Sequence, residues 1–474
     1  MVAMSSTSFW DRVAEIFHLK DVPFMGVPDY MFSIEYWLGA IATSALAWQA
    51  LTGLVLLLYY QPSNAYDSTM AIIHNVPFGS IILSSHLYGA YVMILAVYVH
   101  GLEVFFRGAY KRPRGAQWVL GVLLFAMTLG AAFVGYSLTG DVLSADAVGV
   151  GKGILTALGL SQVIPVFFGN GTQLDLFTRF LGWHIILASA LILFFFIHFY
   201  LAEQNGFMPD PRETNYRAPA LLSKNDARLK PWWPRNFVYM VSIVLFTWGI
   251  ILVIPSILAI PSILGRIPIL FSPYPGPSPT SPQASSVPAY PPWFFLFMYK
   301  MADMPFGLST DILMGIFIPL IVLLIVPLLD RSDLLHPLDR PWITALFITG
   351  LTWVIELSIW SAIQPGVPVE LTWFALTIVP PVVIAFGGVY AVSRVWVRVK
   401  AKPSGNGKGA GFKLSKNTAL SLGYVTSLLA IIAIAVSFTL NPISDGPYVG
   451  VMWGTALISF AASLLAYFYV EYIQ

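Results

Sequence analysis

The chain has 474 residues, of which 57% are hydrophobic and 10% are charged, whereas a soluble domain carries about 25% charged residues. Its net charge is +2, which gives no reason to expect a nucleic acid partner. It contains no cysteine, which excludes disulfides, thiolate metal sites and an iron–sulfur cluster held by this chain. This composition indicates a multi-pass, all-α integral membrane protein.

Ten apolar segments are long enough to cross a bilayer. They follow residues 1–33, an N-terminal segment that we expect to form an amphipathic helix in the membrane interface, with Trp10, Ile16 and Phe17 on its apolar side. The expected spans are residues 34–60, 79–102, 116–138, 180–202, 237–260, 312–329, 341–363, 371–393, 418–440 and 448–470.

Positive charges are distributed unequally between the two ends of these spans. With a cytoplasmic N-terminus, the segments on that side hold 21 of the 25 Lys and Arg residues, and the opposite side holds Lys152, Arg179, Arg266 and Lys300. Because short cytoplasmic loops are enriched in Lys and Arg, this split predicts a cell-membrane protein with both termini cytoplasmic.

Four of the seven histidines form two matched pairs inside apolar spans. His86 and His100 lie fourteen residues apart in the second span, and His184 and His198 lie fourteen residues apart in the fourth. Fourteen residues at about 100° each bring two imidazoles to one helix face, about 21 Å apart. If the two spans lie side by side, the four imidazoles form two stacked bis-histidine sites, each suited to one haem. The alternative is that they are packing residues, although ionisable side chains are rare in membrane spans.

The first and third spans repeat the same step with glycine. Gly39 and Gly53 are fourteen residues apart, as are Gly121 and Gly135. Since glycine inside a helix costs about 1 kcal/mol relative to alanine, we expect these positions to give clearance to the edge of a macrocycle at each level. Close helix packing by small residues is the simpler alternative. The first four spans are therefore expected to form a four-helix bundle.

With these features the chain resembles the cytochrome b subunit of cytochrome bc-type quinol oxidoreductases over about residues 30–400. The resemblance rests on YWLGA and WQALTG in the first span, FVGYSL in the third, TRFLGWH in the fourth and PLLDRSDLLHPLDRP after the sixth. It implies a dihaem four-helix bundle at 34–210, further cytochrome b helices with a proline-rich outer loop at 211–400, a basic linker at 401–417 and two additional transmembrane helices at 418–474.

The chain departs from the family pattern at the outer loop. The family signature Pro-Glu-Trp-Tyr is here Pro291-Pro292-Trp293-Phe294, so Pro292 replaces the glutamate that is thought to accept a quinol proton. Glu103 stands where the family usually has an arginine, and the last two spans lie outside its common eight-span core. These departures leave the four histidines untouched but put the route of the quinol proton in doubt.

Further side chains are expected to serve the haems and the quinol. Arg179 would pair with the propionates of the outer haem, and Arg114 with those of the inner one, with Lys111 or Arg112 as substitutes. The aromatic walls of an outer quinol site are expected from Phe133, Tyr136, Trp293, Phe294 and Tyr299, although aromatic residues are also common in interfacial belts. The candidate proton acceptors are Asp141, Asp146 and Asp303. Candidates for a second quinone site near the inner haem are Glu203, Asp226 and Lys230.

The leading interpretation is a dihaem cytochrome b subunit of a respiratory quinol oxidoreductase, an enzyme complex that moves electrons from quinol across the membrane. The resemblance implies a separate Rieske-type iron–sulfur protein and other respiratory-complex subunits as partners, membrane lipid around the chain, and a dimer or supercomplex as the assembly. One alternative is a cytochrome b-like subunit of a terminal quinol oxidase supercomplex, in which A-type haems would replace b-type haems. The other is a non-redox membrane transporter or scaffold that keeps the bundle.

Overall fold

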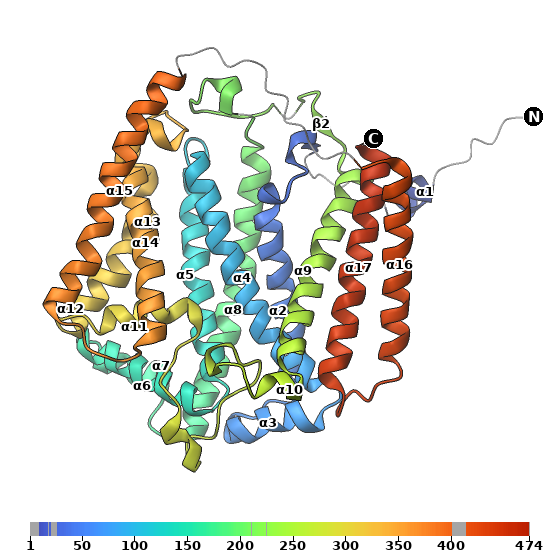
Figure 1. The fold of residues 1–474 in the computed structure, drawn as a ribbon. Coiled ribbons are helices and arrows are strands. Elements are labelled where there is room, and N and C mark those ends of the chain that lie inside the picture. The colour runs from blue at the N-terminus through green and yellow to red at the C-terminus, as the bar shows by residue number, and fades with distance from the viewer. Residues whose placement is uncertain are drawn as a thin grey trace, which may run out of the picture.

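A computed structural model of the protein describes residues 9–17, 19, 26–209, 211–223, 225–400 and 414–473. Within these ranges ten helical segments are long and apolar enough to cross a membrane, which confirms the expected number of spans and the all-α class. They form one bundle of roughly parallel and antiparallel helices (Figure 1). The spanning helices are α2 (Leu38–Leu57), α4 (Gly79–Arg107), α5 (Gly115–Ser137), α8 (Gln173–Asn205), α9 (Phe237–Leu258), α13 (Ile318–Leu329), α14 (Pro341–Ile363), α15 (Leu371–Lys400), α16 (Lys416–Ser437) and α17 (Gly446–Tyr472).

The four helices of the N-terminal bundle pack as two pairs. Helix α2 lies against α4 and α5 lies against α8, while α4 contacts α5. Helix α8 begins at residue 173, well before the expected position, because the Thr172 side chain accepts a hydrogen bond from the Asp175 N–H and caps the first turn. The extra turns place Arg179 on the helix itself.

Short helices cover the two ends of the bundle. Helices α3 (Ala65–Asn75), α6 (Val142–Ala157), α7 (Ile164–Phe168), α10 (Pro261–Leu264) and α11 (Leu296–Ala302) lie at the end opposite α1 (Phe9–Phe17) and the C-terminal end of α17 (Figure 1). We call the end with these five short helices the outer end, and the end with α1 the inner end. The sequence analysis did not anticipate the outer helices, whose apolar residues are too few for a span.

The remaining elements are short. Strands β1 (Val27–Pro28) and β2 (Leu229–Lys230) pair antiparallel at the inner end. The sixth span is α12 (Leu308–Ile312) joined to α13 by the π-helical turn η11 (Leu313–Phe317). The other turns are η2 (Asp29–Met31), η3 (Ile34–Trp37), η4 (Pro62–Asn64), η5 (Ser161–Val163), η6 (Pro211–Thr214), η7 (Trp232–Asn236), η8 (Ile269–Phe271), η9 (Pro282–Ser286), η10 (Trp293–Phe295) and η12 (Pro337–Asp339).

The last two helices are firmly attached to the bundle. Helix α17 packs along α9 and contacts α4, and α16 packs on α17. Gly450 and Gly454 of α17 lie so close to α9 that an added Cβ atom would meet Ser256 and Val253 within 2.4 Å. Small residues at this spacing let two helices approach closely in a membrane. The basic linker that precedes α16 falls outside the described residues between 401 and 413.

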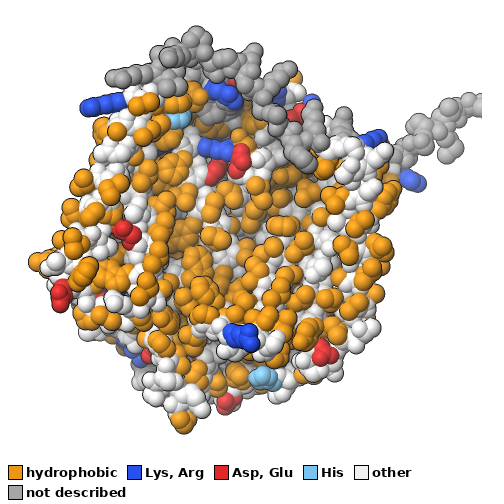
Figure 2. Space-filling model, viewed as in Figure 1, with side chains coloured by type: hydrophobic (Ala, Val, Ile, Leu, Met, Phe, Trp, Pro, Cys, Tyr) orange, Lys and Arg blue, Asp and Glu red, His pale blue; other side chains and the backbone are white. Residues whose placement is uncertain are grey.

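The surface agrees with a membrane environment. Figure 2 shows a broad hydrophobic band over the helices, with most of the visible charged side chains near its two edges. In the most apolar stretch of α8, 6% of the residues are buried inside the protein. Because exposing such an apolar helix face to water is unfavourable, lipid or another protein chain is expected to cover it.

Candidate functional site

The four histidines of the two spans face one another across the bundle. His86 on α4 and His184 on α8 have ring centroids 6.3 Å apart, with an angle of 70° between the ring planes. His100 and His198 lie within range of a direct electrostatic interaction one level further in. The structure therefore brings the residues together in the combinations that parallel helices require.

The Nδ1 atoms of the outer pair are held by hydrogen bonds. His184 Nδ1 lies 3.0 Å from the Ala131 carbonyl, so this nitrogen carries the proton and donates it. His86 Nδ1 lies 2.8 Å from Thr52 Oγ1. Because the Thr52 hydroxyl donates to the Trp48 carbonyl at 2.6 Å, its oxygen accepts from His86. Both imidazoles consequently keep Nε2 unprotonated, which is the state of a metal ligand.

The inner pair is held less tightly. The Gln117 carbonyl lies near His198 Nδ1, but the contact falls outside hydrogen-bond geometry. His198 Nδ1 is therefore without a hydrogen bond among the described residues, because such a bond needs both a short distance and alignment. His100 Nδ1 lies 3.8 Å from the Glu103 carboxylate, which in turn binds Arg107 Nε at 2.9 Å.

Each histidine has a glycine of a neighbouring helix against its ring. Gly53 and Gly39 of α2 face His86 and His100, and a Cβ atom added at these glycines would lie 3.3 and 3.5 Å from Cε1. On α5, Gly135 faces His184 and Gly121 faces His198, with corresponding distances of 2.6 and 3.3 Å. The glycines thus give clearance to the imidazoles themselves, a closer neighbour than the macrocycle edge expected from the sequence.

The outer pair fits a metal ion bound between two imidazoles. A metal–imidazole nitrogen bond of about 2.0–2.1 Å on each side places the two ring centres about 6–6.5 Å apart, and the rings of His86 and His184 match this separation. Among the described residues no group of three or more His, Asp or Glu side chains could hold a metal ion. Each pair could therefore supply two ligands to a metal ion whose remaining ligands come from a group other than the described side chains, and a haem fits this requirement.

The cations near the two ends have protein partners. Arg179 Nε pairs with Asp175 at 3.0 Å and is about one-third exposed, one and a half turns before His184. Arg114 is buried, and its terminal nitrogen donates to the Gly206 and Ala220 carbonyls; burial lowers its pKa to about 10. Lys111 is bound to Asp330 at 2.8 Å and is fully enclosed, so it is no substitute for Arg114.

The aromatic residues expected at the outer site do come together. Trp293 and Phe294 both lie edge-on to Tyr91 of α4, and Phe133 of α5 lies edge-on to Phe295. Phe294 is buried in this cluster, while Trp293 is partly exposed. The Tyr136 hydroxyl donates to the Tyr290 carbonyl at 3.4 Å, and Tyr299 packs against the same cluster.

The inner quinone candidates are scattered. Asp226 pairs with Arg228 at 2.8 Å on the surface, and Lys230 lies in β2 opposite Val27. Glu203 lies on the last turns of α8. The contacts at this end instead unite Glu103, Arg107 and Glu35.

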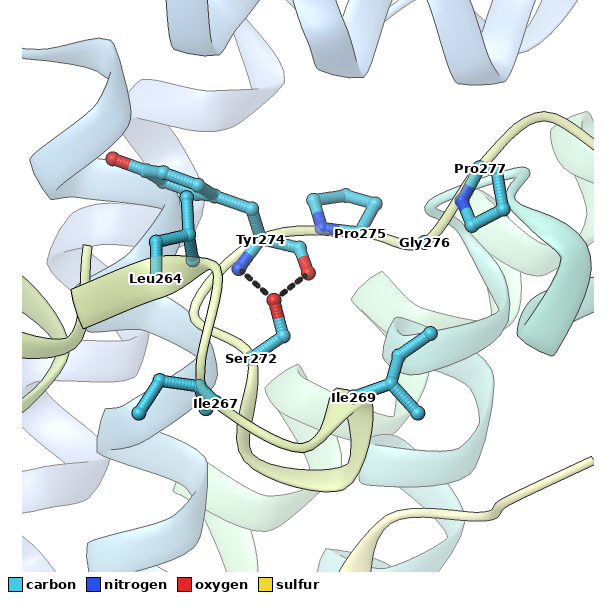
Figure 3. A pocket seen from close by; sticks show the side chains of 8 residues that line it. All are labelled: Leu264, Ile267, Ile269, Ser272, Tyr274, Pro275, Gly276 and Pro277. Carbon is cyan, nitrogen blue, oxygen red and sulfur yellow. Dashed lines mark hydrogen bonds between the residues drawn. The ribbon is translucent and has the colours of Figure 1, made fainter. Parts of the chain in front are cut away.

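An open hollow in the outer loop is separate from the histidine pairs (Figure 3). Inside it Ser272 Oγ binds the backbone of Tyr274. Tyr274 supplies the one titratable side chain of the lining, so the hollow offers no acid–base chemistry at neutral pH. Its lining is Leu264, Ile267, Ile269, Ser272, Tyr274, Pro275, Gly276 and Pro277.

Sequence reasoning missed the residues that orient the histidines. Thr52 immediately precedes Gly53, and the Ala131 carbonyl lies one helical turn before Gly135. The role of Thr52 could have been predicted from the sequence, because its hydroxyl lies next to one of the glycines that are fourteen residues apart. The Ala131 carbonyl is a backbone group, which carries no sequence signal.

A membrane-spanning helix bundle with facing pairs of imidazoles is the architecture of a membrane cytochrome. The family described as "Cytochrome b(N-terminal)/b6/petB" matches residues 91–279. Cytochrome b of Sulfolobus acidocaldarius is 43% identical over 403 residues, which cover 81% of this chain and 71% of the relative. The chain therefore belongs to the cytochrome b family, whose members bind haem.

Two further proteins are similar to this chain, one in sequence and one in fold. The menaquinol:cytochrome c reductase cytochrome b subunit of Bacillus subtilis is 34% identical over 210 residues, which cover 42% of this chain and 91% of that protein. A chain of a solved "Hyperthermophilic respiratory Complex III" superposes with a TM-score of 0.62 at 22% identity, over 81% of this chain and 97% of that chain. The second likeness concerns the fold.

Proposed function

We propose that this chain is the dihaem cytochrome b subunit of a respiratory quinol oxidoreductase, taking electrons from quinol at the outer end and carrying them to the inner end. The observation that carries the proposal is the face-to-face pair His86 and His184, with both Nδ1 atoms hydrogen-bonded and both Nε2 atoms left as ligands. The same two helices bring His100 and His198 together at the inner level, where the Nδ1 atoms lack such hydrogen bonds.

We propose a role for each group of residues around the two histidine pairs. The four histidines would hold two haems, and Gly39, Gly53, Gly121 and Gly135 let the imidazoles approach their helices. Bound there, the haems supply reversible one-electron transfer. Held by two imidazoles each, they would carry electrons and would not bind oxygen. Arg179 and Arg114 are the cations proposed to lie beside the propionates.

Quinol would bind at the outer end among Tyr136, Trp293, Phe294 and Tyr299. Flat aromatic walls and phenolic hydroxyls suit a quinone ring. Because quinol oxidation in this family delivers electrons to two acceptors, we propose a separate Rieske-type iron–sulfur protein and further respiratory subunits as partners, in a dimer or supercomplex. We also propose that the inner end, with both termini, is cytoplasmic, as the 21 Lys and Arg residues assigned to that side favour.

A pyridine haemochrome assay on the purified protein tests this function. We expect two haems per chain with a bis-imidazole, low-spin spectrum in the native protein. Reduction by a decyl-substituted quinol would then establish the redox role. A haem-free protein would overturn the proposal and leave a transporter or scaffold.

A second candidate function is a cytochrome b-like subunit of a terminal quinol oxidase supercomplex. Two observations favour it, Pro292 in place of the glutamate and the tightly packed extra helices α16 and α17. The same assay separates the candidates by haem type, because A-type and b-type haems give different haemochrome bands. Copurification of an oxygen-reducing subunit would decide for the oxidase.

A further inference from the structure

Three acidic residues lie at the outer end near the candidate quinol site, and two of them have structural tasks. Asp141 is 2% exposed. Its carboxylate accepts hydrogen bonds from the Ser144 N–H at 2.9 Å, from Thr139 Oγ1 at 2.9 Å and from the Gly276 N–H at 2.7 Å. It therefore caps α6 and ties the outer loop to it, with little capacity left for a ligand.

Asp303 serves a buried cation. Its carboxylate lies 3.4 Å from Lys300 Nζ, and the Lys300 side chain is completely buried. Lys300 also donates to the Gln364 and Val367 carbonyls at 3.2 and 2.8 Å. Removing the Asp303 charge would leave this ammonium group without its counter-ion, so Asp303 is needed where it is.

Asp146 is different, because no described side chain binds it. It lies half-buried in the second turn of α6, and its side chain forms no hydrogen bond or ion pair with the described residues. Its carboxylate interacts electrostatically with the Tyr136 hydroxyl on α5 and with the Tyr299 hydroxyl on α11. Among the three carboxylates, Asp146 is thus the one without a hydrogen bond or ion pair to the described residues, and it lies within electrostatic range of both phenols of the candidate quinol site.

The surroundings of Asp146 contain few other charges. Helix α6 packs against α5, α7, α12 and η5. The titratable side chains of these elements and α11 are Tyr136, Asp311 of α12, and Tyr299 and Lys300 of α11, while α7 and η5 carry none; α6 itself also carries Lys152. Asp141 lies at the start of its own helix. Lys300 binds Asp303, and among the described residues neither Lys300 nor Lys152 forms an ion pair with Asp146.

We infer that Asp146 accepts a proton from quinol bound at the outer site, taking over the role left open by Pro292; this rests on the proposed function. Oxidation of quinol to quinone breaks two O–H bonds and releases two protons and two electrons. The electrons pass singly to two one-electron acceptors, a ferric haem and a high-potential iron–sulfur protein. One proton forms a new O–H bond on the Asp146 carboxylate, and the other leaves with the iron–sulfur partner.

The environment also suits Asp146 to act as a base. Burial, and then the charge of Asp141, raise the pKa of Asp146 above the ordinary range of aspartate. A carboxylate with a raised pKa binds a proton more strongly, which favours proton transfer from a weak acid such as quinol. The same shift requires a higher pH to deprotonate it, so turnover should fall as the pH drops through this raised value.

The inference is tested with Asp146→Asn and Asp146→Glu in the intact complex isolated from membranes, with Asp67→Asn on the exposed side of α3 as the outer-end control. We measure kcat and KM for a decyl-substituted quinol against pH. Infrared difference spectra on quinol addition report a carboxylic acid C=O band. We expect Asp146→Asn to lose about 10²-fold or more in kcat, to lose the acidic limb of the pH profile and to lack the infrared band. Asp146→Glu should restore most of the rate, and Asp67→Asn should keep the rate, the limb and the band.

The possible outcomes distinguish a failure of the Asp146 assignment from a failure of the proposed function. If the wild-type complex holds haem that quinol reduces, while Asp146→Asn keeps the wild-type rate, pH profile and infrared band, the Asp146 assignment is wrong and the proposed function stands. Loss of the band in Asp67→Asn while Asp146→Asn keeps it would likewise overturn the Asp146 assignment. A wild-type protein whose haem quinol cannot reduce would overturn both.

Discussion

Gly135 on α5 lies directly against the imidazole of His184 on α8. A Cβ atom at position 135 would stand 2.6 Å from His184 Cε1, far inside the separation at which two carbon atoms attract. The Ala131 carbonyl, one turn earlier on α5, accepts the hydrogen bond of the same ring at 3.0 Å. A missing side chain and a backbone oxygen on one helix therefore fix the position of an imidazole on another.

Replacing one of these glycines by alanine should displace the adjacent histidine. The effect should be larger where the added Cβ atom would lie closer to the imidazole ring. We expect Gly135→Ala to displace His184 and to remove or shift the outer haem signal in optical and electron paramagnetic resonance spectra. Gly39→Ala, whose Cβ atom would lie 3.5 Å from His100 Cε1, is the matched control and should leave the inner signal nearly normal. Equal effects at both positions would contradict the contact geometry.

The pairing of the histidines predicts which haem each substitution removes. His86→Ala and His184→Ala should abolish the same haem signal, because the two rings share one site. His100→Ala and His198→Ala should abolish the other. Redox titration followed optically distinguishes the two signals by their midpoints. A spectrum in which His86→Ala and His198→Ala remove the same signal would mean that the pairs are diagonal.

Lys111 and Asp330 form a buried ion pair at the inner end, and breaking it should destabilise the protein. Asp330 also accepts a hydrogen bond from Tyr110, and Arg340 Nη1 lies 3.5 Å away. Lys111→Met would leave the carboxylate without its main counter-ion, at a cost of about 3–5 kcal/mol. Thermal unfolding in detergent measures the loss, and the double variant Lys111→Met/Asp330→Leu should recover part of it.

The same cluster predicts a pH dependence of stability. Burial alone would raise the pKa of Asp330, but hydrogen bonds from Lys111, Tyr110 and Ser332 outweigh it and lower the pKa below the ordinary value. The contribution of Asp330 is therefore fully present above the ordinary aspartate pKa and is lost as the pH falls through the lowered one. In Asp330→Asn this acid-induced part of the unfolding curve should disappear.

Proteolysis tests the orientation of the chain in the membrane. Seven of the 25 Lys and Arg residues lie between residues 394 and 417, and the positive-inside rule assigns this stretch to the cytoplasm. Trypsin should cut it in inverted vesicles and spare it in sealed right-side-out vesicles. A protease site engineered into the outer loop near Ser281 should show the opposite pattern and serves as the control.

Sequence periodicity predicted the spans and the histidine pairs well, because both depend on local geometry. A run of apolar residues and a fourteen-residue step are properties of one helix, so they survive without knowledge of the fold. The choice among Asp141, Asp146 and Asp303 could not be made in this way. Asp141 is occupied by Gly276, which the fold brings from more than a hundred residues away, whereas the Lys300–Asp303 pair is local and only the burial of Lys300 depends on the fold.

Bulk added to the interface of α17 should loosen the last two helices. Gly450→Leu would drive a side chain into Ser256, whose Oγ would lie 2.0 Å from an added Cβ atom. Overpacking of this kind costs about 1–3 kcal/mol. We expect a lower unfolding temperature, while Gly423→Leu on α16, with its nearest neighbour at 3.3 Å, should be milder.

The close fit of α17 along α9 has a consequence for how this polypeptide could be encoded. Phe78, at the corner that begins α4, stacks on Trp453 and donates its N–H to the Pro442 carbonyl. These contacts hold α16 and α17 against the bundle. The peptide link through residues 401–413 is therefore not needed to keep the two helices in place. Two genes, one ending before that stretch and one starting after it, should yield halves that find each other in the bilayer and copurify.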